Sequence, residues 1–259
     1  MYTIDFINRV IFGECSEVMS GIPDLSIDLT VTSPPYASMR EYNGYQFSFE
    51  TVALQLFRVT AIGGVLVWVV GDETRNGSES GESFRQALHF KELGFLLHDT
   101  MIFEKNHFSN PSRNRYHQSF EYMFVFSKGR PKTFNPIKDL PVKYGKPWGT
   151  TSARNQDGSL SQRVSAGSAG VFGMRKNIWR YTVGNGFKNS VATTHPATFP
   201  DKLAEDHILS WSNAGDVVLD PMCGSGTTLR VARNNHRRFI GIDISQEYVD
   251  MSLSSLGML

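Results

Sequence analysis

The sequence has few cysteines and no long hydrophobic run. Its 259 residues include only Cys15 and Cys223, too few for a disulfide framework or for a cysteine-based zinc site. No apolar run approaches the roughly 20 residues that span a bilayer. The first residues also lack the charged start and apolar centre of a signal peptide. We therefore expect a cytoplasmic protein with reduced thiols, no membrane span and no bound metal.

Charge is balanced over the whole chain but not along it. The net charge is +1, yet residues 105–188 hold 15 Lys and Arg against 3 Asp and Glu, a net charge of +12. The rest of the chain carries a net charge of −11. A solvated loop region could be this basic, but aromatic residues recur among the cations. This combination favours a nucleic-acid partner.

Continuous apolar runs alternate with segments that carry apolar residues at helical spacing. The runs are rich in β-branched residues and end at Gly, Pro or Asp, which is typical of parallel strands covered on both faces. Expected strands are 9–13, 27–33, 63–72, 122–128, 216–221 and 238–245; expected helices are 49–61, 82–94, 199–212 and 227–236. The alternation predicts an open, mostly parallel α/β sheet with helices on both faces. Periodicity is poor in residues 130–188, which is also typical of disorder, but aromatic residues recur through them. We therefore predict an irregular insert or a small subdomain that orders around a partner.

Two short motifs follow expected strands. The first is TSPPY, residues 32–36, where two prolines make a stiff turn between a hydroxyl and an aromatic ring. The second is DPMCGSGTT, residues 220–228, in which glycines allow close approach to a ligand and a helix begins. About twenty residues later Asp243 ends the next strand, where a carboxylate can bind both hydroxyls of a ribose. A plain tight turn with a capping aspartate is the alternative, but the two features together favour a nucleoside-containing ligand.

Taken in order, TSPPY, DPMCGSGTT and GIDIS (residues 241–245) resemble the S-adenosylmethionine-dependent amino-group DNA methyltransferases of the permuted β class. The resemblance covers nearly the whole chain and implies a Rossmann-like methyltransferase sheet with a target-recognition insert. It implies a catalytic half in residues 1–104 and a cofactor-binding half in residues 191–259. Between them, residues 105–190 form the basic segment, which includes a core strand (122–128) and the insert.

The resemblance assigns the catalytic role to Ser33, Pro34, Pro35 and Tyr36. An exocyclic amino group is a poor nucleophile because its lone pair is delocalised. The Ser33 hydroxyl and the Pro34 carbonyl can hold its N–H bonds and favour the tetrahedral nitrogen. Tyr36 offers a ring on which a base rotated out of the duplex can stack.

The resemblance also implies S-adenosylmethionine as cofactor and double-stranded DNA as substrate. The expected cofactor contacts are Glu14, Thr32, Phe199, Asp220, Pro221, Cys223, Gly224, Ser225, Gly226, Thr227 and Asp243. The family more often has Asp where Glu14 stands. The expected DNA contacts are Arg113, Arg115, Arg154, Arg163 and Lys176, which most simply meet phosphates.

Within the family that the sequence resembles, Ser at this position of the motif is associated mostly with cytosine N4 as the methylated atom, and Asp mostly with adenine N6. A neutral hydroxyl can accept from the amino group and also donate to the cytosine ring nitrogen N3, which is consistent with that association. Adenine N6 is the close alternative. A methyltransferase of RNA or of a protein amide is a third reading, although the protein-amide enzymes carry Asn in place of Ser33. A catalytically silent nucleic-acid-binding module is a fourth. A restriction-modification or phage setting is expected, and a separate restriction endonuclease and a monomeric or homodimeric state remain open.

Overall fold

The computed structural model describes residues 5–35, 47–108, 113–141, 151–163, 172–182 and 200–259. Two expected site residues, Tyr36 and Phe199, and the side chain of Arg163 lie outside the described parts. The chain divides into two compact units, a larger one of residues 1–135 and 177–259 and a smaller one of residues 136–176.

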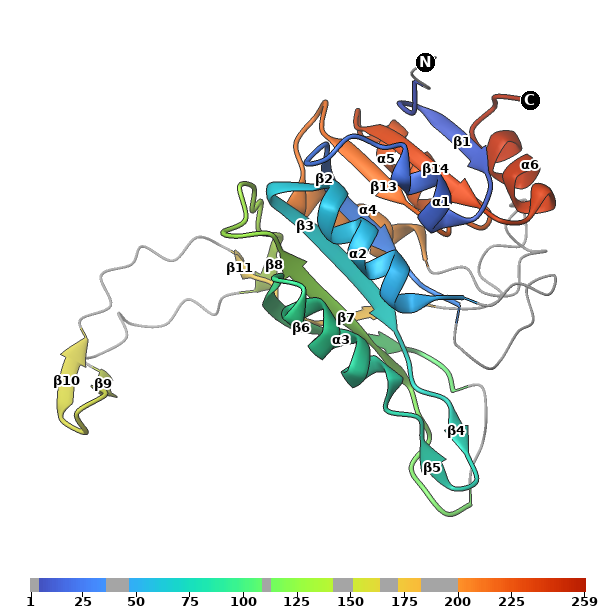
Figure 1. Ribbon diagram of the computed structural model, residues 1–259. Coiled ribbons are helices and arrows are strands. Elements are labelled where there is room, and N and C mark those ends of the chain that lie inside the picture. The colour runs from blue at the N-terminus through green and yellow to red at the C-terminus, as the bar shows by residue number, and fades with distance from the viewer. Residues whose placement is uncertain (1–4, 36–46, 109–112, 142–150, 164–171, 183–199) are drawn as a thin grey trace. The chain divides into compact units, whose positions relative to one another are not determined.

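The larger unit is built on an eight-stranded sheet with the order β1-β14-β13-β2-β3-β7-β6-β12 (Figure 1). The strands are β1 (Arg9–Phe12), β2 (Ile27–Thr32), β3 (Thr60–Val70), β6 (Leu96–Lys105), β7 (Phe120–Ser127), β12 (Ile178–Tyr181), β13 (Val217–Asp220) and β14 (Arg238–Asp243). Only β7 runs antiparallel to its neighbours, β3 and β6. The other neighbouring strands pair parallel. The expected mostly parallel α/β sheet is confirmed.

In the described ranges, six helices flank the sheet. They are α1 (Cys15–Ser20), α2 (Phe49–Val59), α3 (Glu82–Glu92), α4 (Asp201–Trp211), α5 (Thr227–Asn234) and α6 (Gln246–Ser255). Figure 1 shows α1, α2 and α3 in front of the sheet. Six consecutive residues of β3, residues 65–70, are at most 2% exposed, so both faces of this strand are covered. That explains its continuous apolar sequence. No helix in the described ranges is long and apolar enough to cross a membrane.

The expected strands and helices are all present. In and beside the eight-stranded sheet, the sequence analysis missed β6, β12, α1 and α6, and it also missed the short strands outside this sheet. β6 and β12 complete the sheet beyond β7, α6 packs on β1 and β14, and α1 packs on α2 and β14. β6 was missed because polar residues interrupt its sequence, LLHDTMIFEK, and alternate residues are exposed. α1 has only 6 residues, too few to show a helical period.

The smaller unit consists of two short antiparallel pairs. β8 (Lys138–Pro141) pairs with β11 (Phe172–Met174), and β9 (Thr151–Arg154) pairs with β10 (Leu160–Arg163). The next strand, β12, already belongs to the sheet of the larger unit. The part of the expected basic segment that forms a separate unit is therefore residues 136–176, while the role of that unit in target recognition stays a prediction.

Candidate active site

The two motifs meet at one edge of the sheet. Because β1, β14, β13 and β2 are parallel, their carboxyl ends share an edge. Phe12 pairs with Asp243 across β1 and β14, and Asp220 pairs with Gly241 across β13 and β14. β2 pairs with β13 and ends at Thr32. TSPPY and the glycine loop, far apart in sequence, thus become neighbours.

The TSPPY turn, expected to be catalytic, is tied to the glycine loop by side-chain hydrogen bonds. The hydroxyl of Thr32 donates to Oδ1 of Asp220 at 2.8 Å, and both residues are buried. From the other side, Thr228 Oγ1 on α5 donates to the carbonyl of Val31 at 3.3 Å. These bonds fix the end of β2 directly before Ser33, which is itself half-buried. Thr32 therefore positions the turn, whereas the sequence analysis had expected it to contact the cofactor.

The glycine loop needs its glycines for backbone conformation and for close packing. Gly224 and Gly226 have φ angles of 51° and 79°, in the left-handed region. A Cβ on Gly226 would also lie 2.8 Å from Oγ of Ser252 on α6. That same hydroxyl donates to the carbonyl of Gly224 at 2.7 Å. The loop is thus held against α6, and α5 begins directly after it at Thr227.

Asp243 is 8% exposed and lies against the glycine loop. Its Oδ2 accepts from the Gly224 N–H at 2.9 Å, and its Oδ1 accepts from the Ser245 N–H at 2.9 Å. Each carboxylate oxygen retains a further acceptor position. Burial raises the pKa of Asp243, and the backbone hydrogen bonds oppose that rise. The carboxylate is therefore oriented by the backbone, and its expected contact with a ribose stays a prediction.

Glu14 is used by its own helix. Its carboxylate caps α1, accepting from the Glu17 N–H at 2.8 Å and from the Ser16 hydroxyl at 2.5 Å. Burial raises the pKa of Glu14, but these hydrogen bonds outweigh burial and lower it. The Glu14 side chain is therefore a structural cap at the end of β1. Any contact with an adenine must use the acceptor positions of this carboxylate that the capping hydrogen bonds leave open.

The electrostatics of the edge suit a cationic nucleoside. The charged side chains described at these four strand ends are Glu14, Asp220 and Asp243, and all are acidic. Burial raises the pKa of Asp220 to about 6, against the Thr32, Thr228 and Met222 hydrogen bonds that favour the carboxylate. A phosphate would be repelled here, whereas a nucleoside that carries a positive charge beside its ribose would be attracted. The residues present therefore fit S-adenosylmethionine, whose sulfonium is cationic.

The other expected cofactor residues line the same loop. Pro221, Cys223, Ser225 and Thr227 are all buried. Burial also raises the pKa of the Cys223 thiol well above its usual range, so this cysteine stays protonated and is not a nucleophile. Among the described residues, no group of three or more His, Cys, Asp or Glu side chains could hold a metal ion.

The expected DNA contacts fall in both units. Arg113 and Arg115 lie in the larger unit, and Arg154 and Lys176 lie in the smaller one. Arg113, Arg154 and Lys176 are exposed. Arg115 is turned onto the protein, donating to the Gly77 carbonyl at 2.7 Å.

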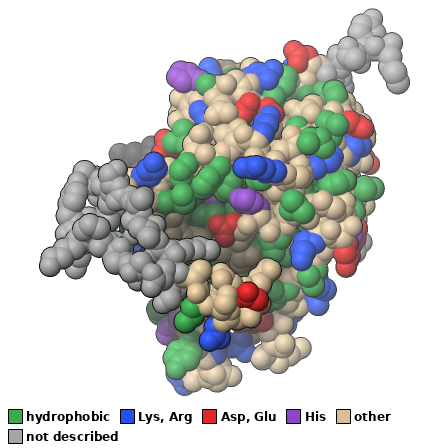
Figure 2. Space-filling model, turned by 90° about the vertical axis from the view of Figure 1, so that its left-hand side faces the viewer, with side chains coloured by type: hydrophobic (Ala, Val, Ile, Leu, Met, Phe, Trp, Pro, Cys, Tyr) green, Lys and Arg blue, Asp and Glu red, His purple; other side chains and the backbone are tan. Residues whose placement is uncertain are grey.

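Part of the basic segment is neutralised by ion pairs. Cations of this segment pair with carboxylates in Lys105–Glu121, Lys132–Asp28, Arg175–Asp139 and Arg180–Glu104. On the face shown in Figure 2, Lys and Arg side chains are dispersed among hydrophobic and uncharged ones. The net charge of +12 in the sequence is therefore an upper limit on the charge that these residues can present to a polyanion.

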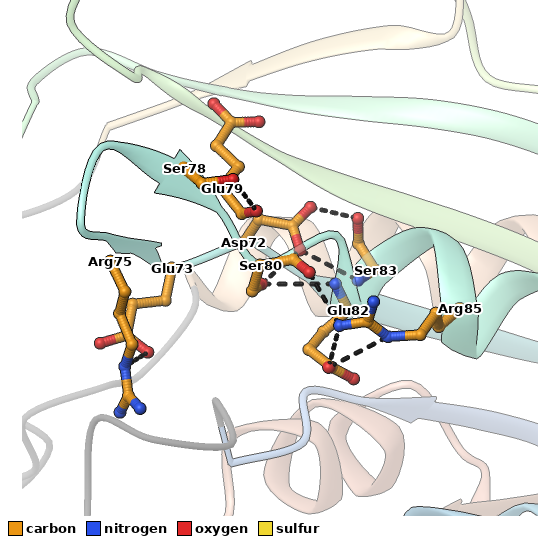
Figure 3. A network of polar contacts seen from close by, with 9 residues as sticks. All are labelled: Asp72, Glu73, Arg75, Ser78, Glu79, Ser80, Glu82, Ser83 and Arg85. Atoms are coloured by element: carbon orange, nitrogen blue, oxygen red, sulfur yellow. Dashed lines mark hydrogen bonds and ion pairs between the residues drawn. The ribbon is translucent and has the colours of Figure 1, made fainter.

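Asp72 is a buried carboxylate at this edge of the sheet that the sequence analysis did not single out. This residue ends the expected strand 63–72 and lies just beyond β3, which pairs with β2. It is buried, and it accepts from the Ser80 hydroxyl at 2.8 Å and the Ser83 N–H at 3.1 Å (Figure 3). Burial raises the pKa of Asp72, but these hydrogen bonds outweigh burial and lower it. Its position after a buried strand was the available signal, because Asp220 and Asp243 occupy the same kind of position.

Comparison with known proteins identifies the family of the chain. A family model described as a DNA methylase of the N6/N4 type matches residues 27–254. The chain is 56% identical over 237 residues to the orphan methyltransferase M.BamHII of Bacillus amyloliquefaciens, covering 89% of each chain. It is 28% identical over 266 residues to the type II methyltransferase M.BglII of Bacillus subtilis, covering 96% of this chain and 69% of that protein.

Solved structures share the fold. PvuII DNA methyltransferase (cytosine-N4-specific) superposes with a TM-score of 0.67 at 21% identity, covering 95% of this chain and 85% of that one. A DNA modification methylase of Thermus thermophilus, in complex with S-adenosyl-L-methionine, superposes with a TM-score of 0.65 at 23% identity. That match covers 96% of this chain and 93% of the other. At these identities the likeness establishes the fold.

Proposed function

The chain belongs to the family of N6/N4 DNA methylases, and from this premise we propose that it methylates cytosine N4 within a short sequence of double-stranded DNA. S-adenosylmethionine is the methyl donor. The observation that carries the proposal is the Thr32–Asp220 hydrogen bond of 2.8 Å, which joins the catalytic turn to the glycine loop. An amino group held at Ser33 would therefore lie next to a donor held by the loop.

The cofactor, when bound, supplies a methyl group on a sulfonium that a neutral nitrogen can displace directly. Asp243 would take the ribose hydroxyls through its remaining acceptor positions. The glycine loop allows the nucleoside to approach the backbone, and the first N–H groups of α5 are available beside it. Asp220, buried and next to the turn, favours positive charge at this edge.

The turn positions the reacting nitrogen. Ser33 Oγ and the Pro34 carbonyl accept hydrogen bonds from the two amino N–H groups and favour a tetrahedral nitrogen. With S-adenosylmethionine held by the glycine loop, the oriented nitrogen would displace the sulfide leaving group directly, the electron pair of the broken carbon–sulfur bond staying on sulfur. The nitrogen then loses a proton to solvent. The step needs no covalent enzyme intermediate, in keeping with the protonated, buried thiol of Cys223.

Ser33 is our reason for preferring cytosine over adenine, because Ser at this position is associated mostly with cytosine N4 in the family that the sequence resembles. Its hydroxyl can accept from the amino group and donate to the cytosine N3 acceptor beside it. Adenine N6 methylation by the same turn is the second candidate, because adenine N1 is an acceptor in a corresponding position. The setting we propose is modification in a type II restriction system, as the name of M.BglII states for that protein. M.BamHII is named an orphan, so the reaction itself requires no endonuclease.

The experiment that tests the proposal identifies the methylated base. Purified protein is incubated with S-adenosylmethionine and unmethylated DNA of mixed sequence. The DNA is then digested to nucleosides and analysed by mass spectrometry against standards. We expect N4-methylcytosine. N6-methyladenine would keep the cofactor and the mechanism but overturn the assigned base, and no methylated nucleoside would overturn DNA as the substrate.

Replacing Ser33 tests the role of the turn. We expect Ser33→Ala to lower kcat by roughly 10²–10³-fold, the cost of removing one preorganised hydrogen-bonding group from an active site. The affinity for S-adenosylmethionine, measured by calorimetry, should change little. Ser26→Ala at the opposite end of β2 is the control, since the Ser26 hydroxyl bonds locally, to the Pro23 carbonyl. Wild-type turnover in Ser33→Ala would remove Ser33 from the mechanism.

A further inference from the structure

Two loops leave the sheet at the same edge as the catalytic turn. Thr32 at the end of β2 pairs with Trp68 of β3, and β3 ends two residues later. Val70 at that end pairs with Tyr122 of β7, and Phe120 of β7 pairs with Glu104 of β6. At this edge residues 71–81 lead from β3 to α3, and the connection from β6 to β7, described over residues 106–108 and 113–119, also leaves the sheet. Figure 1 shows the β4–β5 hairpin and the β6–β7 connection projecting together beyond the sheet.

The first loop is anchored to the body of the protein. It forms a small hairpin, β4 (Thr74–Arg75) and β5 (Ser78–Glu79). Asp72 at its base accepts from Ser80 and Ser83, which binds both ends of the hairpin to the start of α3 (Figure 3). Arg85 on α3 adds a bond to the Ser80 carbonyl at 2.8 Å. The hairpin is therefore a supported projection, because a buried carboxylate and a helix both hold its base.

The second loop is braced against this hairpin. The Arg115 guanidinium donates to the Gly77 carbonyl at 2.7 Å and to the Thr74 hydroxyl at 3.3 Å. The rings of Phe108 and His117 are in contact, with centroids 3.9 Å apart. The described parts of this loop, residues 106–108 and 113–119, hold two arginines and two histidines and no acidic residue.

Tyr116 stands between these two braces and points outward. It is 101% exposed, as open as in an extended chain. Its neighbours in sequence, Arg115 and His117, both have contacts within the protein. This ring contributes nothing to the core, because it lies in water. Its loop is basic and braced, so the ring is placed to enter a partner that has both negative charge and flat apolar faces. A nucleic-acid duplex has both.

We propose that Tyr116 enters the DNA duplex and stacks in the space that the target base leaves, and that Arg115 positions it by holding its loop on the β4–β5 hairpin. The proposal rests on the proposed function, since an amino group inside a duplex is unreachable unless the base rotates out. Rotation sacrifices stacking on both sides of the base. Side chains inserted between base steps offset such losses in proteins that deform DNA. Arg115 is thus assigned to the protein rather than to a phosphate.

The test uses a duplex with 2-aminopurine in place of the target base, at a site that wild-type enzyme is shown to methylate. The fluorescence of 2-aminopurine rises when the base leaves the stack. We expect Tyr116→Ala to reduce this rise and to lower kcat/KM on the natural duplex by roughly 5- to 100-fold, the range of one lost aromatic–base stack. Tyr116→Phe should retain both, because the ring and not the hydroxyl stacks.

Two arginine variants separate positioning from charge. Arg115→Met should reduce the fluorescence rise as Tyr116→Ala does. Arg113→Ala removes an exposed cation from the same loop, and should weaken DNA binding and reduce the salt slope by about one without changing the fluorescence of the saturated complex. Thermal unfolding of each variant reports whether it folds.

The outcomes are distinguishable from those that test the proposed function. A folded Tyr116→Ala enzyme with the fluorescence and kcat/KM of the wild type overturns the role of Tyr116 and leaves the methyltransferase proposal standing. An Arg115→Met enzyme that behaves as wild type overturns the positioning role. A wild-type enzyme that methylates no DNA overturns the proposed function, and this inference with it.

Discussion

At the scale of single residues, the bond between Thr32 and Asp220 is the smallest feature with a catalytic consequence. It crosses from one motif to the other and is fully buried. Loss of a hydrogen-bond donor to the buried Asp220 carboxylate would cost free energy of folding, because burial already disfavours the charged form of this group. The turn and the loop therefore cannot shift independently without breaking this bond.

Thr32→Val tests that coupling. Valine has nearly the same shape but no hydroxyl, so Asp220 loses a donor and the protein should lose about 1–3 kcal/mol of unfolding free energy. Urea unfolding measures the loss, and kcat should fall because Ser33 is the next residue. Thr32→Ser keeps the hydroxyl and is the matched control. Equal stability and kcat in the valine and serine variants would contradict the coupling.

The raised pKa of Asp220 has a consequence for stability against pH. The folded protein binds this proton more tightly than the unfolded chain, since the pKa is about 6 rather than 3.8. Its contribution is therefore present below about pH 4 and is lost as pH rises to about 6. Compared with Asp220→Asn, wild-type protein without cofactor should lose up to about 3 kcal/mol over this interval and no more above it. A stability difference independent of pH, measured by urea unfolding, would refute the buried-carboxylate assignment.

The sequence allowed the site residues to be predicted more readily than their partners. The positions of Ser33, Asp220 and Asp243 at one edge could be predicted because each lies at or directly after the end of a buried strand, and parallel strands end together, while their roles stay predictions. The occupation of Glu14 by its own helix could not be seen, because α1 is too short to be recognised by its period. Arg115 was expected to contact DNA, but its direction depends on a hairpin 38 residues away in sequence.

At the scale of elements, the glycine loop combines two requirements that a substitution can separate. Gly226 has a φ of +79° and also packs against Ser252. Gly215, in the turn before β13, has a φ of +86° but nothing within 4 Å of a Cβ. The first position therefore carries strain and a steric conflict, and the second carries strain alone.

We expect Gly226→Ala to lower the unfolding free energy by more than Gly215→Ala does. Backbone strain in the left-handed region costs each variant on the order of 1 kcal/mol. The Cβ at position 226 must in addition displace α6, and overpacking typically costs a further ~1–3 kcal/mol. Urea unfolding of both variants measures the difference, and equal losses would show that α6 yields without cost. The affinity for S-adenosylmethionine should fall only in Gly226→Ala.

A strand could be predicted from the sequence where both of its faces are buried. β3 and β13 are covered on both faces, and their apolar runs are unmistakable. β6 and β12 lie toward one end of the sheet, where one face of each strand is largely exposed and the apolar signal is diluted by charged residues. The position of β6 in the sheet is set by its pairing with β7. Sequence patterns do not reveal such a pairing.

At the scale of the whole molecule, the smaller unit can be removed with little disturbance to the larger one. The two ends of this unit meet, because the Arg175 N–H donates to the Ile137 carbonyl at 2.8 Å. A short linker of about four residues, typical of a hairpin connection, can therefore replace residues 138–174. The described residues at the carboxyl ends of β13, β14 and β2 all belong to the larger unit.

The excised protein should keep its fold and its cofactor affinity while losing DNA affinity and sequence selectivity. Residues 138–174 hold 5 Lys and Arg and 2 Asp and Glu, a net charge of +3. If these cations meet phosphates, the slope of log affinity against log salt should decrease by about two to three. Calorimetry with S-adenosylmethionine and thermal unfolding control for the integrity of the larger unit. An excised protein that methylates the same sites with the same salt slope would place target recognition in the larger unit, at the edge where Tyr116 projects.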